Sequence, residues 1–170
     1  DQYGLAKVTA GNVTALCVFA GSFLRPVGGA LADRIGGTRM LAIVLVTASA
    51  GLALVGAAPP LSAAIALLFG VMGCLGMGNG AVFQLVPQRF QKEIGVATGV
   101  VGAAGGIGGF FLPAVLGMAK QATGSFTLGW LCAGAAGLGC VALLRFVERG
   151  WNASWLAAAP PRTAPEPADA

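Results

Sequence analysis

The sequence predicts an all-α, polytopic membrane protein with five transmembrane helices, and three observations predict it. Of the 170 residues, 56% are hydrophobic and only 9% are charged, whereas soluble domains carry about 25% charged residues. The apolar residues form long runs, each close to the roughly 20 residues that cross a bilayer as a helix. The charged residues lie almost entirely between these runs.

The elements follow one another with short connections. Residues 1–10 are expected to form an extracytoplasmic loop, and residues 149–170, rich in alanine and proline, a disordered cytoplasmic tail. Pro59 and Pro60 separate the second span from the third, so that these helices become antiparallel neighbours. The five spans are predicted at about residues 11–32, 40–58, 61–86, 94–118 and 126–146.

The basic residues indicate how the helices are oriented. Cytoplasmic loops of membrane proteins carry an excess of lysine and arginine. One side of the predicted bundle has six basic residues against Lys7 and Lys120 on the other; the six are Arg34, Arg39, Arg89, Lys92, Arg145 and Arg149. This bias predicts an outer N-terminus and a cytoplasmic C-terminus in the cell (inner) membrane. Because the bases are few and scattered between spans, the net charge of +4 does not indicate nucleic-acid binding.

The sequence contains few residues of the kinds that catalyse reactions or bind metals. The chain contains no histidine, which excludes a nucleophile activated by histidine. Its four cysteines lie inside spans without a CxxC pair, so we interpret them as packing residues and not as zinc ligands. We therefore expect no enzyme activity, no cofactor and no metal.

Arg25 is the only charge in the first span. A cation deep in the bilayer costs about 2.5–3.5 kcal/mol even on the lenient insertion scales. Two interpretations account for it: the guanidinium faces a ligand in a water-filled cavity, or its long stem reaches back to the headgroups. Arg25 lies seven residues from Ala32, roughly 10 Å along a helix axis, a distance that strains the second interpretation.

Glycines follow one face of the fourth span. Spacings of four and three residues place Gly95, Gly99, Gly102, Gly106 and Gly109 together, and Gly105 and Gly108 widen the stripe. Each glycine costs up to about 1 kcal/mol relative to alanine in a helix. The stripe therefore indicates either close packing of helices through small residues or a bare backbone that lines a substrate path, formed by Gly102, Gly105, Gly106 and Gly109.

A second glycine cluster in the third span surrounds Asn79. A buried amide must find hydrogen-bond partners, so Asn79 either bonds to another helix or contacts a polar substrate. Pro26, Pro87 and Pro113 each remove a backbone donor and leave a carbonyl free in the preceding turn. Each predicts either a simple kink or a break of the kind that transporters use in moving helices.

The segment between the first two spans, residues 29–39, combines an acid with several bases at the membrane edge. Its glycines, Gly36 and Gly37, permit a tight turn. Asp33 is expected to pair with Arg34 or Arg39, or to accept hydrogen bonds from the start of the next helix. The segment serves either as a gating loop, with Gly29, Asp33, Arg34, Gly36 and Arg39 as its members, or as a plain hairpin with cytoplasmic charges.

The pattern GxxxDRxGxxR at residues 29–39 resembles the cytoplasmic loop signature of the major facilitator superfamily, which recurs between the second and third helices of each half. Three further strings narrow the resemblance to the nitrate/nitrite porters. They are GSFLRPVGG at residues 21–29, GNGAVFQLVPQRF at 78–90 and the glycine-rich GVVGAAGGIGGFFLP at 99–113. The resemblance covers roughly residues 1–148.

The resemblance implies that the five spans are the last five of a twelve-helix fold and that an N-terminal half of the same transporter is missing. It also implies transport of nitrate or nitrite by alternating access. The anion would be held between two arginines, one from each half, and Arg25 matches the one from the second half. Since the predicted spans contain no Asp, Glu or His, nitrate/nitrite exchange is favoured over proton symport.

Two alternatives stay open at this point. The chain could come from a major facilitator transporter of another small anion or of an organic acid. It could also be a non-transporting membrane subunit in which Arg25 pairs with an acidic residue of a partner protein.

Overall fold

The computed structural model describes residues 4–158, and all regular structure in this range is helical. Six helices follow one another: α1 (Lys7–Phe23), α2 (Arg25–Ile35), α3 (Gly37–Gly56), α4 (Leu61–Arg89), α5 (Ile94–Thr123) and α6 (Thr127–Ala158). Helices α1 and α2 together make one membrane-length element, so five elements are long and apolar enough to cross a bilayer. The prediction of an all-α protein with five membrane-spanning helices is confirmed.

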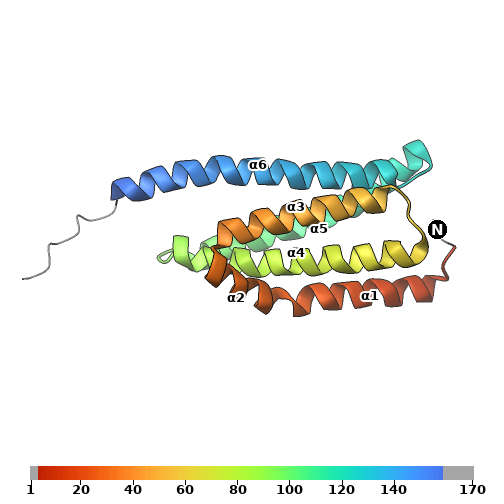
Figure 1. Cartoon of the computed structure of the whole chain (residues 1–170), viewed down its shortest axis with the longest axis horizontal. Coiled ribbons are helices and arrows are strands. Elements are labelled where there is room, and N and C mark those ends of the chain that lie inside the picture. Colours follow the sequence, from red (N-terminus) through yellow and green to blue (C-terminus); the bar gives the residue numbers. More distant parts are fainter. Residues whose placement is uncertain (1–3, 159–170) are drawn as a thin grey trace, which may run out of the picture.

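The helices lie nearly side by side (Figure 1). Helix α4 packs against α1 and α2 on one side and against α3 on the other, and α3 in turn packs against α6. Helix α5 contacts α6 and, less extensively, α4. Along this bundle α1, α2, α4 and α6 run in one direction, whereas α3 and α5 run in the other.

The first predicted span is divided in two at Leu24, which ends α1 and precedes α2. Pro26 lies in the first turn of α2 and has no N–H to offer the carbonyl of Ser22. Hydrogen bonds from Leu24 to Ala20 and from Gly28 to Leu24 carry the chain across this kink. Helix α1 begins at Lys7, so part of the loop predicted for residues 1–10 is helical, because residues 7–10 contain no helix breaker.

A single residue, Gly36, joins α2 to α3. Its φ of 90° lies in the left-handed region that glycine adopts without strain, and its N–H donates to the carbonyl of Ala32 at 2.9 Å. Gly37 is already helical, and a Cβ there would overlap the side chain of Leu85 on α4. The tight turn expected from the two glycines is present, but only Gly36 supplies the unusual backbone angle.

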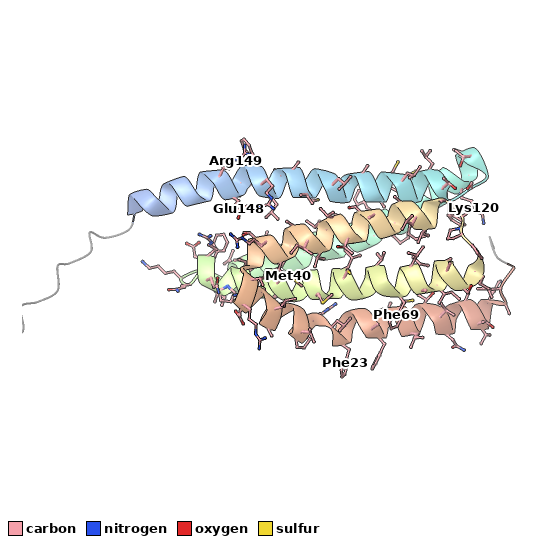
Figure 2. All side chains as sticks on the ribbon, in the orientation of Figure 1. Phe23, Met40, Phe69, Lys120, Glu148 and Arg149 are labelled. Atoms are coloured by element: carbon pink, nitrogen blue, oxygen red, sulfur yellow. The ribbon has the colours of Figure 1, made fainter. Side chains whose placement is uncertain are left out.

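The best-packed region lies where α2, α3 and α4 meet. Ala32, Met40, Val44 and Ala81 form a buried cluster in which Ala81 is fully enclosed. Small alanines from α2 and α4 leave room for Met40 of α3, which Figure 2 labels at the end of the bundle where the three helices meet. This packing fixes α2 against α4, the pair of helices that carries Arg25 and Asn79.

Helix α6 is longer than predicted and ends at Ala158, beyond the end expected at residue 146. The prediction of a disordered tail is therefore wrong for residues 149–158. This segment is rich in good helix formers such as Ala153, Leu156 and Ala157, and prolines begin only at Pro160. The rest of the predicted tail, residues 159–170, lies outside the described part of the chain.

Candidate anion-binding site

A cavity of about 180 Å³ lies between the α1–α2 pair and α4. Its walls are single faces of the two helical elements, because the lining residues recur at the spacing i, i+3, i+4, i+7 on both sides. One wall consists of Val18, Gly21, Ser22 and Arg25, and the other of Met72, Leu75, Gly76 and Asn79.

Close backbone contact sets the width of this cavity. A Cβ on Gly76 would overlap the carbonyl group of Gly21, and a Cβ on Gly80 would overlap the carbonyl oxygen of Arg25. On the opposite helix, a Cβ on Gly21 would lie 2.9 Å from the carbonyl oxygen of Met72. Helices approach this closely only through residues without side chains. The glycines of α4 thus hold the backbone of Arg25 directly beside the turn that bears Asn79.

Three polar side chains face the cavity: Ser22, Arg25 and Asn79. Arg25 is exposed and Asn79 is half-buried. Across residues 4–150, whose side chains are described, none of the three has a hydrogen bond or an ion pair with another side chain. Asn79 therefore does not bond to another helix in this structure, and Arg25 is not neutralised by a carboxylate of the described chain.

The remaining walls are apolar, formed by Val18, Met72 and Leu75. A guanidinium is a permanent cation with five N–H donors and therefore attracts an anion that enters the cavity. Its planar fork of N–H donors matches the oxygens of a small planar oxyanion through two parallel hydrogen bonds. The arrangement can therefore bind such an anion and orient it.

The predicted glycine residues of the substrate site lie elsewhere. Gly102, Gly105, Gly106 and Gly109 of α5 are exposed, and a Cβ added at any of them would meet no atom within 4 Å. None of them lines the cavity that holds Arg25 and Asn79. The structure thus brings Arg25 together with Asn79 and leaves the α5 glycines on a separate, uncovered face.

The predicted gating loop has different partners from those expected. Asp33 accepts a hydrogen bond of 2.6 Å from Nε2 of Gln84 on α4, and no pairing with Arg34 or Arg39 is present among the described side chains. No side chain caps the start of α3 either. The expected pairing within the loop is wrong because α2 continues through Asp33 and directs this residue to α4. Gly29 also lies against α4, since a Cβ added to Gly29 would be 3.6 Å from the carbonyl oxygen of Gly80.

A second polar link at the same end of the bundle joins α3 to α6. The hydroxyl of Thr38 donates to Oε1 of Glu148 at 2.8 Å, and Arg145 forms a salt bridge of 3.1 Å to Oε2 of the same carboxylate. Figure 2 shows Glu148 directed towards α3, whereas Arg149 points away from the bundle. This link could not be predicted, because no local spacing relates residues that are 110 positions apart.

Two residues of the site and its surroundings were missed by sequence reasoning. Gln84 lacks a sequence signal, since its partner Asp33 is defined only by the packing of α2 on α4. Ser22 had a sequence signal, because it precedes Arg25 by three residues and both therefore lie on the same helical face.

Comparison with known proteins gives a consistent family assignment. The family model of the Major Facilitator Superfamily matches residues 1–167. The nitrite extrusion protein of Bacillus subtilis is 42% identical over 155 residues, which cover 89% of this chain and 37% of that protein. The probable nitrate transporter NarT of Staphylococcus carnosus is 38% identical over 131 residues, covering 77% of this chain and 34% of that protein.

A third relative, the probable nitrate transporter NarT of Staphylococcus aureus strain N315, is 35% identical over 143 residues. These residues cover 84% of this chain and 36% of that relative. The chain therefore spans little more than a third of the length of the curated relatives that it matches.

Proposed function

The chain belongs to the major facilitator superfamily, and we propose that it is the C-terminal part of a transporter that moves nitrate, nitrite or both by alternating access. The names of its relatives, a nitrite extrusion protein and probable nitrate transporters, support the choice of substrate. The five membrane-length helices then correspond to the last five of twelve. Another small anion or an organic acid is a weaker candidate, because these relatives point to neither.

One observation carries the proposal. Arg25 faces a small, largely apolar cavity without a protein carboxylate beside it, in the company of the amide of Asn79. A permanent cation in such surroundings is stabilised when an anion binds. Nitrate and nitrite are small and planar, so the guanidinium fork can hold two of their oxygens and Asn79 can donate to the bound ion.

The rest of the protein would complete the site. The relatives are almost three times as long as their matched segments, and the α5 glycine stripe is uncovered in this chain. We propose that the N-terminal half supplies a second anion-binding arginine and packs against this stripe. Half of a binding site does not suffice for transport, so the chain alone should be inactive.

Anion binding would drive the conformational cycle through the charge of Arg25. An empty site leaves the guanidinium only partly compensated, whereas a loaded site neutralises much of it. This difference in free energy can bias the rocking of two halves about a central site. The bias of basic residues towards one end of the bundle supports a cytoplasmic C-terminus, and the five membrane-length helices together with the bacterial relatives support a location in the inner membrane.

Nitrate uptake by cells that express the full-length gene tests the proposal. Arg25→Lys keeps the charge but loses the planar fork, so uptake should fall about tenfold or more, equivalent to about 1.4 kcal/mol. Arg149→Lys, an equally conservative change at an exposed site that points away from the bundle, should leave uptake unchanged. Normal uptake by the Arg25→Lys variant would show that bidentate binding is not needed.

A further variant, Arg25→Gln, separates ligand binding from a structural role. If Arg25 serves only to pair with an acidic residue of a partner protein, the neutral variant should keep its uptake but lose stability in the membrane, because that carboxylate is left unpaired. If Arg25 binds the anion, the variant should reach the membrane in normal amounts and fail to transport.

A further inference from the structure

We infer that Ser22 is a specificity-determining residue, whose hydroxyl donates a hydrogen bond to the third oxygen of nitrate and so sets the preference of the site for nitrate over nitrite. This inference rests on the proposed function and concerns the same cavity. It begins from the position of Ser22, one helical turn before Arg25 on the same wall.

The chemistry of the two anions provides the reason. A guanidinium fork engages two oxygens of either ion. Nitrate then presents a third oxygen away from the fork, whereas nitrite has only a nitrogen lone pair in that direction. An anion oxygen that faces the apolar side chains of Val18, Met72 and Leu75 without a donor pays a desolvation cost.

The cavity offers two further side-chain donors besides Arg25, and they come from opposite walls. Ser22 belongs to α1 and Asn79 to α4. Neither side chain is engaged elsewhere in the described structure, so both are available to an anion. A hydroxyl is the better partner for an oxygen of variable orientation, because it rotates its proton towards the acceptor, whereas an amide also presents a carbonyl oxygen that repels an anion.

The same geometry explains why Ser22 should discriminate and not merely add affinity. Arg25 contacts the oxygens that nitrate and nitrite share, so its loss should weaken both ions. Ser22 would contact the oxygen that only nitrate has, so its loss should weaken nitrate alone. Sites built to hydrogen-bond a particular polar atom discriminate strongly against ligands that lack it.

Competition between the two ions in cells that express the full-length transporter tests the inference. The apparent KM for nitrate and the inhibition constant for nitrite are measured on the same cells, since their ratio does not depend on the amount of transporter. Ser22→Ala should raise the KM for nitrate about tenfold and leave the nitrite constant within about twofold. Ser22→Thr, which keeps the hydroxyl, should retain the ratio of the unchanged protein.

Ser62→Ala serves as the matched control, because Ser62 is an exposed serine of α4 that does not line the cavity, and this variant should leave both constants unchanged. An unchanged ratio of the nitrate KM to the nitrite inhibition constant in Ser22→Ala would overturn the inference. An equal loss of affinity for both ions would do the same. So would a Ser22→Thr variant whose ratio changes as much as that of Ser22→Ala. Failure of the proposed function gives another result: the unchanged transporter would move neither ion, or Arg25→Lys would transport both normally.

Discussion

Glycines are frequent in both α4 and α5, but the two sets have different surroundings. On α4, Gly73, Gly76, Gly78 and Gly80 each lie where an added Cβ would come within 3.0 Å of a neighbouring helix. On α5, every glycine from Gly95 to Gly117 faces open space by the same criterion. Helix α4 occupies the middle of the bundle, whereas α5 buries Ala119 alone over its whole length.

This difference shows that two helices with a similar glycine content can use their glycines in different ways. On α4 the cost of glycine in a helix is offset by close packing, which at Gly76 and Gly80 is against backbone and positions Arg25 beside Asn79. On α5 a similar cost has no compensating contact among the described residues 4–158. A partner outside the chain would supply it, and the N-terminal half proposed above is the natural candidate.

The largest effect is expected at Gly80. Gly80→Ala places a methyl group on the carbonyl oxygen of Arg25, and overpacking of this kind costs about 1–3 kcal/mol. The variant should melt at a lower temperature in detergent and lose transport, since the cavity is displaced. Gly70→Ala on the same helix has no neighbour within 4 Å and should behave like the unchanged protein, so equal melting of the two variants would contradict close packing at Gly80.

The α5 stripe should give the reverse pattern. A Cβ at Gly102 meets no atom of the described residues within 4 Å, so in residues 1–170 Gly102→Ala should be neutral or stabilising by up to about 1 kcal/mol through helix propensity. In the full-length transporter, the same change should lower nitrate uptake about tenfold, corresponding to about 1.4 kcal/mol. Thermal melting of the short chain and uptake by the long one provide the two measurements, and unaffected uptake would argue against a partner on this face.

Much of the fold could be predicted because a bilayer imposes strong rules on length and polarity. The uncharged runs gave the correct number of spans, since a helix must bury about 20 apolar residues. The ends were less accurate. The kink at Leu24 depends on how Pro26 is accommodated, and the extension of α6 to Ala158 depends on helix propensity beyond the apolar run. The hydropathy of the sequence predicts neither the kink nor the extension.

The site was only partly predictable. Arg25 was identified because a charge inside an apolar span is costly, and Asn79 because a buried amide needs partners. That they share a cavity depends on the register of α1 and α2 along α4, which glycine contacts set and which no local spacing reveals. For the same reason, the partner of Asp33 was missed. Anion binding by these residues stays a prediction until transport is measured.

The smallest effect concerns the polar link that accompanies the α4 packing. Gln84 on α4 donates to Asp33 on α2, at the end of the bundle beyond Gly80. Removing this bond by Gln84→Ala should lower the free energy of unfolding by about 0.5–1 kcal/mol, because the bond is exposed and water can replace it. Oε1 of Gln84 is buried without a hydrogen-bond partner in the described structure, which costs free energy in the folded state. Because Gln84→Ala also removes this unsatisfied oxygen, the net loss of stability is smaller still.

Gln88→Ala provides the control for this last prediction, since Gln88 is an exposed residue of the same helix. A double variant with Asp33→Ala then measures the coupling: if the bond stabilises the α2–α4 contact, the two changes together should cost less than their sum. Full additivity would mean that the glycine contacts and the apolar cluster around Ala81 hold these helices together without this bond. In that case the contrast between α4 and α5 would rest on backbone contact, with no contribution from polar side chains.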